Sequence, residues 1–301
     1  MNFFSVGKNI AKNALVGVMG DRMLAHGSLG LDCRPELISE TLNRIGDLLQ
    51  SRSVDLTNER VLELGPGRTP TLMISMALAG ARKVIGLDVR NWMTPDIYAR
   101  EFLDAIAEAM SGSDLAAFRN SFNITDESVK RNIERMTADR PLEYKLFTGS
   151  SIKEPDNSIA FMYSKSVLEH VRRDMIEDAV TEYYRIMKPG AYAVHIIDLR
   201  DHLHVRGDHQ VEGDWLEALR FPEWLHNAQI SNRRGYINRL RARGWKSVFE
   251  SAGFRCEQWR LRHEQLPAGF DVRQLDKSFH SADEDFSVSW IDALLQKPAT
   301  I

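Results

Sequence analysis

The stretch Arg60-Val-Leu-Glu-Leu-Gly-Pro-Gly-Arg-Thr-Pro70 decides the fold of this 301-residue chain. Its apolar residues over 61–64 predict a short strand of a buried parallel sheet. The two glycines that follow allow a tight turn against which a ligand can lie. A helix is expected next, and then a second apolar strand over 83–88 that ends in Asp88. This strand–helix–strand unit is typical of folds that bind a ribose-bearing cofactor.

The helix between these strands carries its own start and stop signals. Thr69 is a good N-cap, Pro70 suits the first helical position, and Gly80 is a plausible C-terminal stop. The free N–H groups at the helix start favour a carboxylate or phosphate nearby. Asp88 can accept hydrogen bonds from both hydroxyls of a ribose.

The third position of the glycine pattern separates two classes of cofactor. A dinucleotide site needs G-x-G-x-x-G, and Pro70 stands where the third glycine would be. The sequence E-L-G-P-G, which begins at Glu63, instead resembles motif I of class I S-adenosylmethionine (SAM)-dependent methyltransferases. The chain is also similar to that core in the order of three later motifs: Asp156-Asn-Ser-Ile159, Ser166-Val-Leu-Glu-His-Val171 and Met187-Lys-Pro-Gly190.

The resemblance covers about residues 60–90, 144–197 and 245–297. A narrower similarity, to a bacterial subgroup that modifies cell-surface glycans or secondary metabolites, lies in two further segments. These are His195 with Asp198-Leu-Arg-Asp-His202, and Asn238-Arg-Leu-Arg241.

The resemblance implies an α/β fold that is Rossmann-like and doubly wound, with a mostly parallel seven-stranded sheet. We expect a helical N-terminal extension over 1–55 and a SAM-binding domain over 56–301. Two insertions, about 91–142 and 198–243, would lie over the cofactor edge as a substrate cap. The strands are expected near 60–64, 83–88, 144–147, 156–163, 191–197, 254–262 and 286–295, with the last two paired antiparallel at the sheet edge.

The amino-acid composition limits the classes of protein to which the chain could belong. The chain is 43% hydrophobic and 27% charged, which is ordinary for a globular protein, and its net charge of -3 gives no field that would attract nucleic acid. Cys33 and Cys256 are far apart and form no C-x-x-C motif. We therefore expect no disulfide framework or zinc cluster, and a cytoplasmic location.

The N-terminal segment 1–21 reads as amphipathic, because Lys8 and Lys12 interrupt its apolar residues. No apolar run is long enough to span a bilayer. The segment could cover the cofactor or lie on a membrane surface, but a helix packed on the main domain is the favoured interpretation.

The resemblance assigns roles in cofactor binding. Gly65 and Gly67 would pack against the methionine part of SAM, Asp88 would hold its ribose, and Glu63 would order the turn. Arg68 either pairs with the SAM carboxylate or is a solvated surface residue.

Two serines complete the predicted cofactor site. Relatives place an acidic residue after the third strand to hold the adenine amino group, and Ser150 is the substitute here. Ser164 follows the fourth strand, at the edge where ligands of such folds lie.

Candidate bases also lie at this edge. His170 is one, although the family often uses Glu-His at this position to brace the helix start. His202, oriented by Asp198 or Asp201, is another. The same residues could instead hold a metal or form a hydrogen-bonded loop, and we commit to no metal.

Candidate substrate contacts are Lys165 and a run of six cationic residues over 231–246, which includes Arg233 and Arg239. Arginine binds phosphate and carboxylate well, so the substrate could be anionic or sugar-linked. A solvated helical face, or ion pairs with the acidic 91–142 insertion, is the favoured explanation of the run.

The sequence therefore predicts SAM-dependent methylation of a hydroxyl on a small polar molecule. A regulatory or partner subunit that binds SAM without catalysis, and an N-methyltransferase, stay open, while Pro70 argues against a nicotinamide dehydrogenase. We expect no nucleic acid partner and no membrane span, and we allow for a homodimer.

Overall fold

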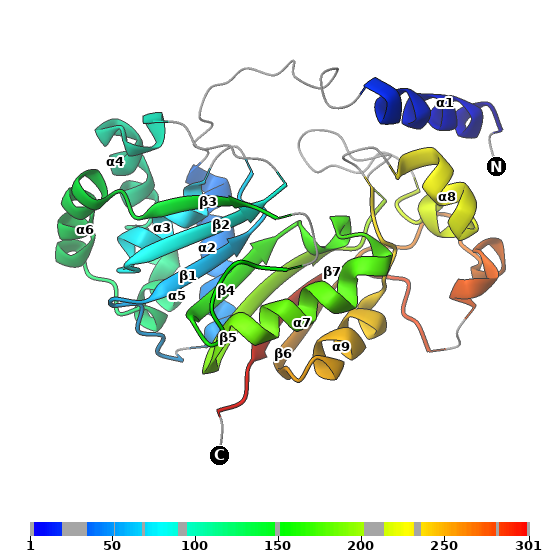
Figure 1. Ribbon diagram of the computed structural model, residues 1–301. Helices are drawn as coiled ribbons and strands as arrows, with labels where there is room; N and C mark the ends of the chain where they lie inside the picture. The colour runs from blue at the N-terminus through cyan, green and yellow to red at the C-terminus, as the bar shows by residue number, and fades with distance from the viewer. Residues whose placement is uncertain are drawn as a thin grey trace.

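The central feature of the molecule is one seven-stranded sheet with the strand order β3-β2-β1-β4-β5-β7-β6 (Figure 1). The computed structural model describes residues 3–19, 35–50, 52–67, 70–89, 95–147, 151–201, 214–231, 236–280 and 283–299. The strands are β1 (Arg60–Leu64), β2 (Lys83–Asp88), β3 (Leu142–Leu146), β4 (Ile159–Lys165), β5 (Met187–Asp198), β6 (Arg255–His263) and β7 (Val288–Gln296).

The first five strands of the chain run parallel, and β7 runs antiparallel to both β5 and β6. This confirms the predicted mostly parallel Rossmann-like sheet with an antiparallel pair at one edge. The parallel strands need crossovers through helices, which explains why helices cover both faces.

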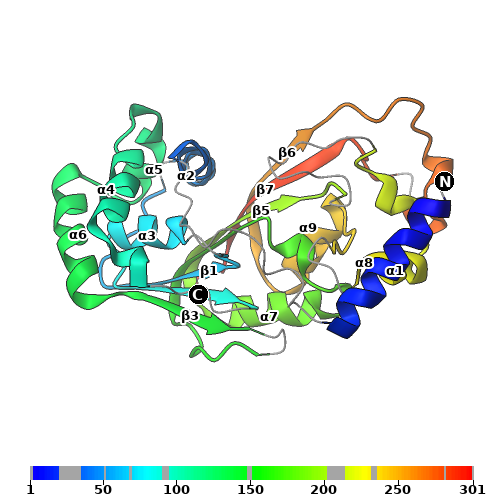
Figure 2. The same cartoon turned by 90° about the horizontal axis from the view of Figure 1, so that it is seen from above.

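The helices are α1 (Phe3–Met19), α2 (Pro35–Leu49), α3 (Thr71–Leu78), α4 (Arg100–Ala109), α5 (Ala116–Ser121), α6 (Asp126–Asp139), α7 (Ile176–Ile186), α8 (Glu223–Ile230) and α9 (Ala242–Ser251). Helices α2 to α6 cover one face of the sheet, and α7 and α9 cover the other (Figure 2). Successive side chains of β1 point to opposite faces of the sheet. Val61 therefore packs in the core under α2 to α6, and Leu62 packs in the core under α7 and α9.

The first insertion has a clear packing role. Helices α4, α5 and α6 pack against α2 and α3, and they bury side chains such as Ile106, Phe118 and Ile133 in the core of that face. These contacts fill a layer of the fold, and the substrate cap expected over 91–142 stays a prediction.

The N-terminal extension packs at two separate places. Helix α1 lies beside α8 in both views, and the Asn13 amide donates to the Ala228 carbonyl over 3.0 Å and to that of Asn227 over 3.3 Å (Figures 1 and 2). Helix α2 instead contacts the sheet, where Arg44 pairs with Asp292 of β7. None of the described helices combines the length and the apolar character that a membrane span needs.

Replacing Arg44 with Met should destabilise the fold by roughly 3 kcal/mol, since it leaves a buried carboxylate short of its main partner. Arg44 and Asp292 are only 6% and 7% exposed. The matched control is Arg273→Met, because Arg273 pairs with Asp271 at an exposed position where such pairs contribute about 0–1 kcal/mol. Urea denaturation measures both, and equal losses would contradict a special role for Arg44.

Candidate functional site

The turn after β1 is fixed by bonds to β2 and β3. The Gly65 N–H donates to the Leu87 carbonyl over 2.7 Å, and the Gly67 N–H donates to Oδ2 of Asp88 over 3.0 Å. The Tyr144 hydroxyl of β3 donates to the Gly67 carbonyl over 2.9 Å. The predicted ribose ligand Asp88 therefore lies directly beside the glycine turn, and its carboxylate also orders that turn.

Both glycines are needed, for different reasons. Their φ angles of 62° and 64° lie in the left-handed region. A Cβ on Gly65 would lie 2.5 Å from Cγ2 of Val167, so this position is sterically closed. A Cβ on Gly67 would meet no described atom within 4 Å. Open space thus borders the turn at Gly67, which fits a ligand that lies against the backbone there.

Glu63 is buried beside the turn. It is 5% exposed, its Oε2 accepts a 2.7 Å hydrogen bond from the Tyr163 hydroxyl, and it also bonds the backbone of Met73 in α3. The expected role of Glu63 in ordering the turn stays a prediction, and Asp88 contributes to that order as well. Burial raises the pKa of Glu63 to about 8, and the neighbouring charge of Asp88 adds to this, while the Tyr163 bond opposes it. Burial therefore keeps Glu63 largely neutral at pH 7.

The start of α3 differs from the prediction. The helix begins at Thr71, and Pro70 precedes it as the N-cap residue without a side-chain capping bond. Thr69, the expected cap, and Arg68 lie outside the described residues. Pro70 lacks an N–H, so the first donors available at this helix start belong to the residues after it.

The ends of β4 and β5 hold several of the predicted residues. Ser164 is 2% exposed, and its hydroxyl lies 2.8 Å from Nδ1 of His195, so its visible role is a bond inside the sheet. Burial lowers the pKa of His195 to about 3, and its ring stacks on Phe249. Lys165 donates to the Thr41 hydroxyl of α2 over 2.7 Å.

His170 lies in a short 3-10 turn, Leu168–His170, after β4. Its Nδ1 is 2.6 Å from the Tyr236 carbonyl. A carbonyl only accepts, so Nδ1 carries the hydrogen, and in the neutral form of the ring the lone pair is then on Nε2. The turn itself is held by Asn238, whose side-chain amide donates to the Leu168 carbonyl over 2.8 Å. This is a defined tautomer on a fixed backbone.

Asp198 and Asp201 are both buried, each 1% exposed. Asp198 accepts two bonds from the Arg200 guanidinium, over 2.9 and 2.8 Å, and this arginine lies over the Trp290 ring. Asp201 donates its N–H to the Trp215 carbonyl over 2.8 Å. The predicted partner of both acids, His202, lies outside the described residues, as do Ser150 and Arg233.

Glu169 is a site residue that the sequence argument did not select. It is 2% exposed, and neither carboxyl oxygen has a hydrogen-bond partner among the described residues. Burial and the nearby Asp198 charge raise its pKa well above the usual range, with Arg200 opposing this. Its position next to His170 in the sequence could have indicated it, but a Glu-His pair at this place is typical of a structural brace for the helix start. No group of three or more described His, Cys, Asp or Glu residues is arranged to hold a metal.

Comparison with known proteins agrees with this geometry. The family described as Methyltransferase domain matches residues 33–258, three quarters of the chain. The chain belongs to the SAM-dependent methyltransferases. SAM is accordingly its cofactor, and the open space at Gly67 beside the Asp88 carboxylate fits that ligand.

Solved structures of methyltransferases are similar to the chain at low identity. A SAM-dependent methyltransferase from Methanosarcina mazei is 14% identical, with a TM-score of 0.45 over 85% of this chain and 97% of that one. A putative SAM-dependent methyltransferase from Listeria monocytogenes is 12% identical, with a TM-score of 0.46 over 85% of this chain and 99% of that one. Geranyl diphosphate C-methyltransferase from Streptomyces coelicolor is 12% identical, with a TM-score of 0.46 over 87% of this chain and 80% of that one. No curated protein matches the chain.

Two arginines in the cationic run of this methyltransferase are buried, whereas Arg243 and Lys246 are exposed and residues 232–235 lie outside the described part of the chain. Arg239 is 7% exposed and donates to the carbonyls of Ala218 and Phe221 and to the Glu223 carboxylate. Arg241 is 4% exposed and donates to two backbone carbonyls. Arg239 thus has a structural role, and its contact with a substrate stays a prediction. Among the described residues of the run, the ion pairs are with Glu223, Asp283 and Glu250 rather than with the 91–142 insertion.

The two glycines give a paired prediction. Gly65→Ala should unfold or strongly destabilise the methyltransferase, because its Cβ would overlap Val167. Gly67→Ala should cost only about 1–2 kcal/mol of stability from its left-handed φ, yet weaken binding of S-adenosylhomocysteine at least roughly tenfold, since the methyl fills the ligand's space. Thermal denaturation and calorimetry measure the two quantities, and normal ligand affinity in Gly67→Ala would argue against the site.

Glu63 gives a pH-dependent prediction. Its folded pKa of about 8 exceeds the ordinary value of 4.5, so the folded state holds a proton that the unfolded state releases between these pH values. Its contribution to stability is present below pH 4.5 and is lost as pH rises to 8. Glu63→Gln should therefore gain a few kcal/mol relative to wild type between pH 5 and 8, at about 1.4 kcal/mol per pKa unit.

Urea denaturation across this range checks the Glu63 prediction. Asp271→Asn is the control, because hydrogen bonds from Arg273 hold the Asp271 pKa at about 2 and keep it ionised throughout. The difference between Asp271→Asn and wild type should stay constant from pH 5 to 8. A constant difference for Glu63→Gln as well would show that Glu63 titrates normally.

Proposed function

We propose that this methyltransferase acts on a hydroxyl group of a small polar molecule, such as a sugar or secondary metabolite, in the cytoplasm. The observation that carries the proposal is the fixed tautomer of His170 at the carboxyl end of β4. Ligands of open α/β sheets bind at this edge, so a base there can reach a substrate beside the cofactor. A hydroxyl needs such a base, because it is a weak nucleophile while it keeps its proton.

The roles of the residues follow from their positions. Bound SAM supplies an electrophilic methyl group. Asp88 and the 65–67 turn hold the cofactor, and the Nε2 lone pair of His170 accepts the hydroxyl proton as the oxygen attacks. The imidazolium that forms is stabilised by the Tyr236 carbonyl at Nδ1. His202 with Asp198 or Asp201 is the second candidate base, and Lys165 is proposed as a substrate contact.

The segment 198–243 is the better candidate for the substrate cap. Its described parts lie past the ends of β4 and β5, where Asn238 bonds the turn before His170 and Trp215 bonds Asp201. Helix α1 packs on α8 of the same segment. We propose that α1, α8 and this segment enclose the substrate, and that the helices of 91–142 do not.

Incubation of the protein with isotope-labelled SAM and a cell extract, followed by mass spectrometry, tests the function directly. A labelled methyl ether on a small molecule is expected. Label on nitrogen would favour the N-methyltransferase alternative. SAM binding without any labelled product from varied extracts would favour a non-catalytic SAM-binding subunit.

His170→Gln should lower turnover about 10²–10⁴-fold, the usual contribution of a general base, and leave affinity for S-adenosylhomocysteine unchanged. His263→Gln is the matched control, because His263 is exposed on β6 and bonds the Ser287 hydroxyl. Steady-state kinetics with the identified substrate make the comparison. If His170→Ala and His202→Ala both keep full turnover at all pH values, no histidine acts as the base.

A further inference from the structure

A buried segment without regular secondary structure, residues 236–241, lies against the turn that carries His170. One part of the segment is fixed to helix α8, because Nε2 of His226 donates to the Ile237 carbonyl over 2.9 Å. Its last residue, Arg241, donates to the backbone carbonyls just past the end of β5 and at the start of β7. The segment therefore joins α8 to the carboxyl edge of the sheet.

Asn238 binds the turn at three of its carbonyls. Its backbone N–H donates to the Glu169 carbonyl over 2.7 Å. Its side-chain amide donates to the carbonyls of Leu168 over 2.8 Å and of Val171 over 3.1 Å. Its Oδ1 accepts from the Leu240 N–H over 3.0 Å, within its own segment. Asn238 is 5% exposed, so no water competes for these bonds.

The orientation of the Asn238 amide is determined by its partners. Two carbonyls lie at its nitrogen and one N–H lies at its oxygen. A flipped amide would place oxygen against oxygen and N–H against N–H, so only one orientation satisfies all three groups. Both amide hydrogens are needed to hold the turn, and a side chain that lacks them cannot take the place of Asn238.

The His170 ring depends on both pieces of backbone that Asn238 joins. The ring is carried by the turn, between the two residues whose carbonyls accept from the Asn238 side chain. Its Nδ1 lies 2.6 Å from the carbonyl of Tyr236, two residues before Asn238. Asn238 therefore sets the separation across which the Nδ1 bond forms. Without that bond a neutral imidazole can carry its hydrogen on Nε2, which then cannot accept a proton.

We propose that Asn238 is a positioning residue for methyl transfer, which holds the Tyr236 carbonyl against Nδ1 of His170 so that Nε2 can accept the proton of the substrate hydroxyl. The proposal rests on the base role of His170 in the proposed function and deepens it. The hydroxyl oxygen gains the methyl group, its proton goes to Nε2, and the electron pair of the broken carbon–sulfur bond stays on sulfur. The Tyr236 carbonyl accepts from Nδ1 before and after this step.

The tautomer of His170 can be measured without the methyl acceptor. Nitrogen NMR of the labelled protein, saturated with S-adenosylhomocysteine, distinguishes a ring nitrogen that carries hydrogen from one that does not. The spectrum of His170→Gln identifies the His170 signals. Where the ring is neutral, we expect the Nδ1–H form in wild type. Asn238→Ala removes the three side-chain bonds, so the Nε2–H form should appear in that variant.

Asn238→Ala should also lower turnover roughly tenfold to hundredfold, which is part of the about 10²–10⁴-fold that a general base contributes. Turnover is measured with the methyl acceptor identified by the labelling experiment, and affinity for S-adenosylhomocysteine should not change. If Asn238→Ala does not fold, Asn238→Asp decides. Aspartate keeps an oxygen for the Leu240 N–H but loses at least one of the two donated bonds, so the same two changes are expected.

Asn132→Ala is the matched control. Asn132 is 8% exposed, and its side-chain amide donates to the Leu78 carbonyl over 2.8 Å under α6, on the other face of the sheet. Its loss should lower stability and leave the His170 tautomer and turnover unchanged. A wild-type tautomer or wild-type turnover in the folded Asn238 variants would overturn the proposal, whatever their melting temperatures, because Asn238 would then only stabilise the fold.

His170→Gln separates this proposal from the base on which it rests. Loss of turnover in His170→Gln, with a wild-type tautomer and turnover in the Asn238 variants, would reject the positioning role and keep the base. Full turnover in His170→Gln would reject the base, and this proposal with it.

Discussion

The hydrogen bond from the Gly67 N–H to the Asp88 carboxylate is the contact on which the cofactor site depends. It joins the turn after β1 to the end of β2, two segments that meet only because their strands pair in parallel register. One carboxylate thereby shapes the turn and remains beside the space that the turn borders. A change in sheet register would separate the two halves, so the site is a product of the fold and not of the glycine motif alone.

The Asp88 carboxylate has a second acid beside it. Glu63 lies two residues before the turn, and two ionised carboxylates in this buried space would repel each other. Burial resolves the conflict, because it raises the pKa of Glu63 to about 8 even though the Tyr163 hydrogen bond opposes this shift. Glu169 and Asp198 repeat the arrangement past the ends of β4 and β5, where burial and the Asp198 charge raise the pKa of Glu169 and Arg200 pairs with Asp198. At both places burial favours the neutral form of one acid that lies beside a second acid.

The strands and the motif order could be predicted because they depend on local patterns: apolar runs, glycines and Asp88 at the end of a strand. The contacts of Arg239 and Glu63 could not. Arg239 is buried because carbonyls from 218 and 221 converge on it, and a run of cationic residues looks the same whether it faces water or a chain segment. Tyr163, the partner of Glu63, is a hundred residues away and reaches it only through the pairing of β1 with β4. Distant contacts of this kind set which predicted polar residues stay available for ligands.

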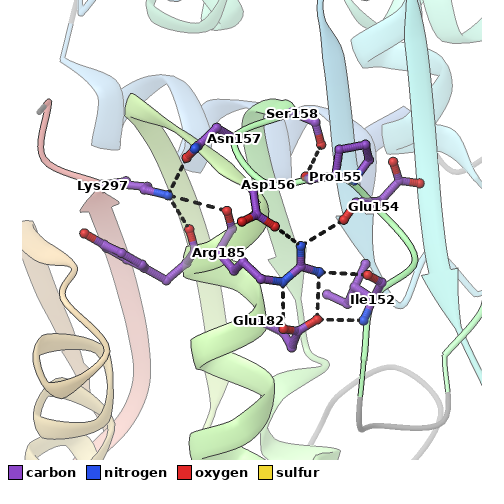
Figure 3. Close-up of polar contacts among 10 residues, drawn as sticks. Ile152, Glu154, Pro155, Asp156, Asn157, Ser158, Glu182, Arg185 and Lys297 are labelled. Carbon is purple, nitrogen blue, oxygen red and sulfur yellow. Dashed lines mark hydrogen bonds and ion pairs between the residues drawn. The ribbon is translucent and has the colours of Figure 1, made fainter.

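Helix α7 joins the turn before His170 to the connection between β3 and β4. The 3-10 turn that holds Glu169 and His170 leads into the N-terminus of α7, and Glu182 and Arg185 near its C-terminus bond the backbone of Ile152 (Figure 3). The helix packs against the sheet through buried side chains that include Ile176, Val180 and Tyr183, so its position is set by that core. A helix held at both ends and along one face fixes the backbone on which the candidate base His170 stands. The base can then be positioned by an element whose own residues need not touch the reacting atoms.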